Sequence, residues 1–192
     1  SFFGILVGAG VITFGSAAVA VPPVVPIIVG GGGACLLDDS LVLADNGATK
    51  KVQDLNIGDD VQAFNIGNGQ VIGTRITKII KQHPRESYYI INGNLFITND
   101  HPVLVLRQDS LKWLKVEDLI RGDKIKSVHG FTAVDSIIKM NESAMTVYIE
   151  TEAGNFIANG GKDYYVVNGN YLDKKITEPN ELNSKIAVEV FN

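Results

Sequence analysis

The sequence predicts a mainly β domain with an internal repeat, and three observations support this. From Cys35 onward, apolar side chains recur in short runs with a period of two instead of the helical period of 3.6. Turn residues rich in asparagine and glycine separate these runs. Segments of the chain then recur further along in the same order. With 192 residues, 45% of them hydrophobic, the chain has enough material for one sizeable core.

The expected strands are short runs bounded by turn signals. They cover residues 40–44, 60–65, 74–82, 88–91, 95–98, 103–107, 113–115, 124–128, 131–139, 146–151, 155–158 and 163–167. The turns between them include Asp45-Asn46-Gly47, Asn68-Gly69, Asn92-Gly93 and His129-Gly130. Residues 52–55 and 116–119 are each typical of a single helical turn, so we expect an all-β domain.

The internal repeat is the most informative pattern. Residues 52–61 read VQDLNIGDDV and residues 116–125 read VEDLIRGDKI. LFITND likewise matches NFIANG at 155–160, and the tripeptide IIK occurs twice. We therefore expect two copies of one β unit to pack about a pseudo-twofold axis and to share a core.

The two copies differ at a position where chemistry is possible. Thr98 and His101 of the first copy align with Ala158 and Gly161 of the second. The threonine hydroxyl can orient a backbone group, and an imidazole that titrates near neutrality can protonate a leaving amide nitrogen. A structural role for this pair stays open beside the catalytic one.

Cys35 is the only cysteine, so it forms no disulfide within the chain. It is a small buried hydrophobe, a partner in an intermolecular bridge, or a nucleophile. Glycines at 30–33 precede it, and the leucines and valine of 36–43 predict a strand that holds it. A thiol in this place can attack the carbonyl of Ala34 and convert the Ala34–Cys35 amide into a thioester.

The first 34 residues contain no charged side chain. Residues 2–21 are apolar or small, about the length that crosses a bilayer as a helix, before Pro22-Pro23 ends it. We expect residues 2–29 to contact a membrane or another copy of the chain; a fragment boundary inside a larger protein is the third reading. The missing initiator methionine suggests that the chain was cut from a longer one.

Charge and ligand spacing argue against two other classes. The net charge is −4, and the seventeen basic residues are scattered, so no nucleic-acid-binding face is expected. Three isolated histidines and one cysteine lack metal-ligand spacing, and we expect neither a metal nor a cofactor.

Several of these residues together resemble one family. Cys35-Leu36-x-x-Asp39-Ser40-x-Val42, the segment 52–61, the T-x-x-H pattern of Thr98 to His101, and Val147-Tyr148 followed by NFIANG are similar to successive blocks of Hint domains. Inteins, bacterial intein-like domains and the hedgehog autoprocessing domain share this module. The resemblance spans roughly 35–168. It implies a horseshoe-like all-β fold and an N-to-S acyl shift at Cys35, with Thr98 and His101 polarising the scissile bond and His101 as general acid.

The chain departs from the splicing members of that family. No histidine precedes Asn168, Gly169 stands where a second nucleophile is needed, and Ile149 replaces a frequent aspartate. Asn183-Ser184 is a later candidate junction without the usual apolar approach. The resemblance is therefore closest to cleaving, splicing-impaired members. Asn168 is also a candidate for slow succinimide formation before Gly169, although a tight turn is the favoured reading there.

We thus expect an uncharged segment at 1–34, a Hint-like β domain at 35–170 and a flank at 171–192. The first functional hypothesis is a single-turnover autoprotease that acts on its own flanking segments. The alternative is a catalytically degenerate module in a larger assembly, such as a virion, secreted or membrane-associated protein, with a membrane-active N-terminal segment. Fold alone does not decide between them.

Overall fold

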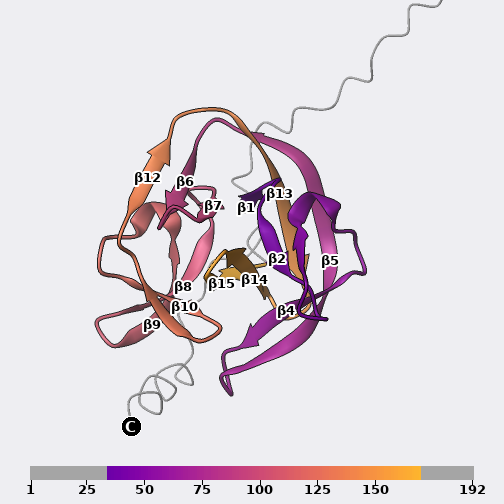
Figure 1. Cartoon of the computed structure of the whole chain (residues 1–192), viewed down its shortest axis with the longest axis horizontal. Coiled ribbons are helices and arrows are strands. Elements are labelled where there is room, and N and C mark those ends of the chain that lie inside the picture. The colour runs from indigo at the N-terminus through magenta and orange to yellow at the C-terminus, as the bar shows by residue number, and fades with distance from the viewer. Residues whose placement is uncertain (1–33, 170–192) are drawn as a thin grey trace, which may run out of the picture. The chain divides into compact units, whose positions relative to one another are not determined.

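The computed structural model describes residues 34–169, which form a domain of antiparallel β-strands (Figure 1). Two short 3₁₀ turns, η1 (Val52–Asp54) and η2 (Val116–Asp118), are the helical elements of this range. The predicted segment 1–34, apart from Ala34, and the predicted flank 171–192 with Asn183 lie outside the described residues. Between Ala34 and Gly169 no helix is long and apolar enough to cross a membrane. The all-β prediction is confirmed.

The first sheet has the N-terminal strand of the domain at its centre, and its strands lie in the order β12-β6-β7-β1-β13-β5-β4. Their bounds are β1 Cys35–Leu37, β4 Asp60–Asn65, β5 Gln70–Arg85, β6 Tyr88–Ile91, β7 Leu95–Ile97, β12 Ile137–Met140 and β13 Ala144–Thr151. The long strand β5 runs beside β13 in Figure 1, and the register pairs His83 with Thr146.

The second sheet has the order β11-β10-β8-β15-β14-β2-β3, with β9 paired to β8. Its strands are β2 Leu41–Leu43, β3 Thr49–Lys51, β8 Pro102–Arg107, β9 Ser110–Lys115, β10 Lys124–Ser127, β11 Gly130–Ala133, β14 Asn155–Gly160 and β15 Asp163–Asn168. The chain passes from the first sheet to the second between β1 and β2, again between β7 and β8, and a third time between β13 and β14. The second passage carries Thr98 and His101.

Most expected strands are present, with two informative differences. The run 131–139 is two strands, β11 and β12, because Val134 turns inward and its N–H bonds to the Asp123 carbonyl. The exposed strand β3 was missed because Thr49, Lys50 and Lys51 show no apolar alternation. Both expected helical turns exist as the single 3₁₀ turns η1 and η2.

The repeat is confirmed down to individual hydrogen bonds. Leu55 N–H donates to the Val52 carbonyl in the first copy, as Leu119 N–H donates to the Val116 carbonyl in the second. The carboxylates of Asp59 and Asp123 then accept from the N–H three residues earlier, at 3.1 and 2.9 Å. The repeated Val, Leu and Asp are therefore the residues that shape one turn twice.

One part of the sequence alignment is wrong. Val52 N–H donates to the Ser40 carbonyl, and Val116 N–H donates to the His101 carbonyl, so Ser40 is the counterpart of His101. The earlier alignment had matched His101 with Gly161. The NFIANG segment belongs to β14, which pairs with β15 and β2, whereas β7 pairs with β6 and β1. The segments 95–100 and 155–160 therefore have similar sequences but lie in strands with different partners.

A hydrophobic core joins the two sheets near the point where the chain crosses between them. Leu36 of β1, Ile97 of β7, Val103 of β8 and Val167 of β15 are buried in one cluster. Each such side chain stabilises the fold by about 1.5–3 kcal/mol through removal of apolar surface from water. Strands β1 and β15 and the connection between β7 and β8 carry Cys35, Asn168, Thr98 and His101 of the candidate site.

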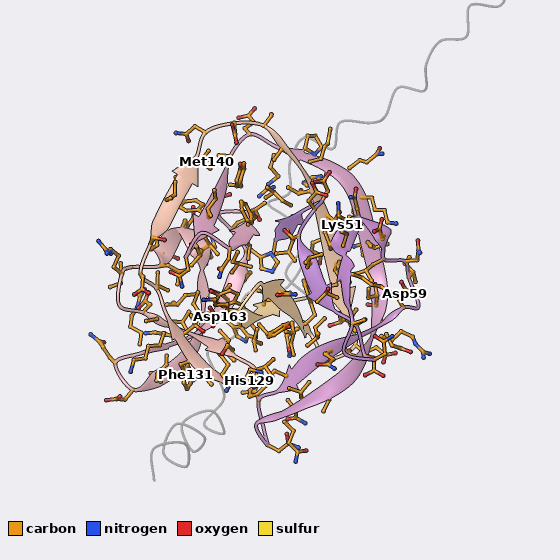
Figure 2. The ribbon with its side chains drawn as sticks, in the orientation of Figure 1. Lys51, Asp59, His129, Phe131, Met140 and Asp163 are labelled. Atoms are coloured by element: carbon orange, nitrogen blue, oxygen red, sulfur yellow. The ribbon has the colours of Figure 1, made fainter. Side chains whose placement is uncertain are left out.

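The two repeat aspartates offer a matched test of the fold. Asp123 is buried and also accepts two bonds from Arg107, whereas Asp59 lies at the edge of the domain (Figure 2) and caps only its own turn. We expect Asp123→Ala to lower the free energy of unfolding by about 3 kcal/mol, because Arg107 loses its partner. Asp59→Ala should cost about 1 kcal/mol. Urea denaturation measures both values, and equal losses would contradict this assignment.

Candidate active site

Cys35 lies in the middle of the first sheet and has no exposed surface. Its strand β1 is flanked by β7 on one side and β13 on the other, with Cys35 opposite Tyr148. Ala34, which supplies the carbonyl of the predicted scissile bond, is also buried. The Ala34–Cys35 peptide bond is thus shielded from bulk water.

Thr98 binds Cys35 through two reciprocal hydrogen bonds. The N–H of Cys35 donates to Thr98 Oγ1 at 2.9 Å, and the N–H of Thr98 donates to the Cys35 carbonyl at 3.0 Å. Thr98 follows directly after β7, in the connection to β8 and outside the strand in which we expected it. The hydroxyl therefore holds the nitrogen that would leave if the Ala34–Cys35 bond broke.

His101 ends the same connection, and its ring is buried. Its Nε2 lies 3.0 Å from the Asn168 carbonyl oxygen, which can only accept a hydrogen bond. We therefore assign the ring proton to Nε2, which leaves a lone pair on Nδ1. Nδ1 is buried and has no hydrogen-bond partner among residues 34–169. A buried nitrogen without a partner is rare and marks a position available to a reacting group.

Burial lowers the pKa of His101 to about 4. The backbone of Cys35, the backbone of Asn168 and the charge of Asp100 each act in the opposite direction, but burial is the largest effect. The ring is therefore neutral at pH 7. In this state it can accept a proton and cannot donate one from Nδ1.

Burial also raises the pKa of the Cys35 thiol, to about 11. A hydrogen bond with the side chain of Thr146 and the charge of Arg85 lower the pKa of this thiol, while Asp100 raises it. The resting thiol is protonated at neutral pH. Its reaction needs a base to take the proton during attack.

The structure adds residues that the sequence analysis did not single out. Arg85, at the end of β5, donates to the carboxylate of Asp100 at 2.7 Å. Thr146 of β13 donates its hydroxyl to the His83 carbonyl at 2.6 Å and contacts the thiol. Asp100 could have been noticed because it lies inside the T-x-x-H pattern. Neither Arg85 nor Thr146 carries any local signal.

The predicted site residues Cys35, Thr98, His101 and Asn168 converge here. Thr98 and His101 contact the backbone of Cys35, and Asn168 is joined to the group through its carbonyl. His129 lies away from them, at the turn between β10 and β11 (Figure 2). Over the described part of the chain, no group of three or more potential ligands could hold a metal ion.

Asn168 and Gly169 do not form the tight turn that the sequence favoured. Asn168 is the last residue of β15 and is paired with Asn155. Gly169 continues the pairing, because its N–H donates to the Gly154 carbonyl at 2.9 Å and its carbonyl accepts from Thr151 N–H at 3.1 Å. The Asn168 carbonyl is thereby held against the His101 ring.

The arrangement suits chemistry on a peptide backbone. A thiol, a hydroxyl bound to the amide nitrogen next to it, and a neutral imidazole lie at the Cys35 backbone. Nε2 of the same imidazole contacts a second backbone carbonyl, that of Asn168, near the other end of the domain.

Comparison with known proteins places the fold. Neither a protein-family model nor a curated protein sequence matches this chain. The structure is similar to the DnaB intein from Synechocystis sp. PCC 6803, with 16% identity, a TM-score of 0.60, and coverage of 71% of this chain and 99% of that one. The TvoVMA intein is also similar, with 17% identity, a TM-score of 0.61, and coverage of 71% of this chain and 98% of that one.

A bacterial intein-like domain from Clostridium thermocellum is also similar, with 16% identity, a TM-score of 0.61, and coverage of 70% of this chain and 97% of that one. The chain therefore contains almost the whole length of each of these domains. The described domain has the Hint fold of inteins and intein-like domains, and the resemblance noted in the sequence is confirmed at the level of fold.

The buried ring of His101 predicts a pH dependence of stability. The pKa is near 6.5 in an unfolded chain and about 4 in the folded one, so the unfolded state binds more protons between these values. The neutral His101 ring makes its full contribution to the free energy of unfolding above pH 6.5. This contribution falls by about 3 kcal/mol as the pH is lowered toward 4. Urea denaturation at pH 7, 5.5 and 4.5 measures this loss. His101→Gln should flatten the difference, and an unchanged pH profile in that variant would contradict the assignment.

Proposed function

We propose that this domain is an autoprocessing module that forms a thioester at Cys35 and cleaves the Ala34–Cys35 bond. One observation carries the proposal: the buried imidazole of His101, whose Nδ1 has no hydrogen-bond partner among residues 34–169, lies beside the Cys35 backbone, which raises the pKa of the ring. The bond between Thr98 Oγ1 and the Cys35 nitrogen supports it, because that nitrogen is the leaving group. The fold is consistent with this role.

The proposed reaction begins with proton transfer to His101. As the Cys35 sulfur bonds to the Ala34 carbonyl carbon, its proton passes to Nδ1. The tetrahedral adduct then loses its C–N bond, and the imidazolium returns the proton to the Cys35 nitrogen. The products are an Ala34 thioester on the sulfur and a free Cys35 amine. His101 thus acts first as base and then as acid.

The need for this base follows from the resting state of the thiol. With a pKa of about 11, only about one thiol in ten thousand is ionised at pH 7. A neutral imidazole beside the Cys35 backbone removes the need for a preformed thiolate. Positioned general bases of this kind contribute about 10²–10⁴-fold to a rate.

The thioester is proposed to end in hydrolysis or in attack by an external nucleophile. Splicing requires a second nucleophile after the C-terminal asparagine, and Gly169 has no side chain to supply one. The substrate is the chain itself, so each molecule reacts once. Cleavage without efficient ligation is the outcome that these residues favour.

The degenerate structural module remains the second candidate, and burial is the observation that favours it. Both Cys35 and His101 are buried, and burial shifts both of their pKa values toward the neutral forms. In this reading, the same side chains merely fill the core between β1, β7 and β13. Measurement of cleavage decides between the two candidates.

We expect the freshly purified full-length chain to lose residues 1–34 at pH 8 in the presence of dithiothreitol. Intact-mass spectrometry should detect the fragment 35–192 and an N-terminal fragment ending at Ala34. Cys35→Ala should abolish the loss, and His101→Ala should slow it by about 100-fold because the base is absent.

His129→Ala is the matched control, because His129 lies at a distant turn and should leave the rate unchanged. A stable wild-type mass over days, with folded protein by circular dichroism, would exclude the autoprocessing function. It would leave the structural module as the function of this domain.

We also propose a slower cleavage between Asn168 and Gly169. Nδ2 of Asn168 attacks the carbonyl carbon of the same residue, the bond to Gly169 breaks, and the Gly169 nitrogen leaves as an amine. The product is a C-terminal succinimide and a peptide 169–192. The bond of 3.0 Å between His101 Nε2 and the Asn168 carbonyl oxygen supports this step, because the ring polarises the attacked carbonyl.

We expect incubation of Cys35→Ala at pH 8 to release the peptide 169–192 over days, as measured by mass spectrometry. Asn168→Ala should abolish this release, and a second change, His101→Ala, should slow it by about tenfold. Asn68-Gly69 is the internal control, because it lies in an exposed turn without an imidazole and should deamidate without cleavage. Equal cleavage at both dipeptides would show that His101 has no role.

A further inference from the structure

A pair of opposite charges lies beside the candidate nucleophile and is almost removed from water. The guanidinium of Arg85 donates to Asp100 Oδ1 at 2.7 Å, and their side chains are 16% and 11% exposed. Among the described ion pairs, only Arg107–Asp123 is buried to a similar degree. A pair in such a place interacts strongly with nearby charge, because little water screens it.

The backbone directs Arg85 toward the site from β5. His83 and Arg85 lie on one face of β5, because side chains alternate along a strand. They pair with Thr146 and Ala144 of β13, and the side chain of Thr146 is hydrogen-bonded with the Cys35 thiol. Asp100 approaches from the other direction, between Thr98 and His101 in the connection that binds Cys35.

The two histidines near Cys35 carry no charge at pH 7. Burial lowers the pKa of both His83 and His101, so both rings are neutral. Tyr148, opposite Cys35 on β13, directs its hydroxyl to Glu150 at 2.6 Å. Glu150 in turn binds Lys78 at 3.4 Å, so this carboxylate has its own partner. Arg85 and Asp100 join β5 to the connection that binds Cys35, and they act on the thiol in opposite directions.

We propose that Arg85 and Asp100 form a positioning pair that sets how readily Cys35 gains negative charge, with the guanidinium activating the sulfur and the carboxylate restraining it. This inference rests on the proposed function for its biological meaning, since Cys35 must react for its ionisation to matter. As a statement about the thiol, it is tested without any cleavage. The Asp100 carboxylate would keep the Cys35 thiol protonated until the base removes the thiol proton.

The single cysteine makes a direct test possible. In the full-length chain labelled with ¹³Cβ-cysteine, one resonance reports ionisation of Cys35 as the pH is raised. We expect Asp100→Asn to lower the thiol pKa by about one unit, and Arg85→Gln to raise it by a similar amount. The double variant should return close to the wild-type value. At pH 8, Asp100→Asn should also increase the cleavage rate about tenfold.

The opposite signs distinguish electrostatics from a loosened structure. A variant that merely opened the site would admit water and lower the thiol pKa in both single variants. Arg85→Lys keeps the charge and should remain within about half a unit of wild type, even if Arg85→Gln unfolds. Asp123→Asn breaks the other buried pair and should leave the Cys35 titration unchanged.

Shifts of the same sign in both single variants would overturn the proposal, as would a Cys35 titration that moves equally in Asp123→Asn. If the thiol shifts as expected but no variant cleaves, the positioning pair stands and the autoprocessing function fails. If wild type cleaves and neither charge moves the titration, the function stands and the pair has no part in it.

Discussion

The two reciprocal hydrogen bonds between Cys35 and Thr98 are the constraint on which the site depends. They attach β1 to the connection between β7 and β8, so the nucleophile and the imidazole are fixed by one short segment. The bond from the Cys35 N–H to Thr98 Oγ1 is buried, and its loss would leave a buried polar group without a partner, which costs free energy. The position of His101 follows, since its N–H donates to the Thr98 carbonyl at 3.2 Å.

The same burial that fixes the site keeps it chemically quiet. It opposes the thiolate of Cys35 and the imidazolium of His101, so the neutral pair is the resting state. A reaction between two neutral groups moves one proton over a short path and separates charge only during attack. A self-processing domain benefits from this restraint, because it must fold before it cleaves.

The sequence was sufficient to predict the β class and the repeated turns, and to single out Cys35, Thr98 and His101 as candidate site residues, but not to show that they converge. Period-two runs and the Val, Leu and Asp of each repeat are local signals, so they can be read without the fold. The Arg85–Asp100 pair was not predictable, because it joins β5 to a distant connection. The mismatch of His101 with Gly161 arose because apolar β-strands have similar letters whatever their partners are.

The corrected repeat shows what the scaffold requires at the position of His101. Ser40 and His101 hold equivalent positions: each backbone carbonyl accepts the first N–H of a 3₁₀ turn, and each side chain donates to a distant carbonyl, Phe96 or Asn168. The scaffold therefore requires only a donor there. A hydroxyl meets that requirement and does no more, whereas an imidazole also brings a second nitrogen to the Cys35 backbone.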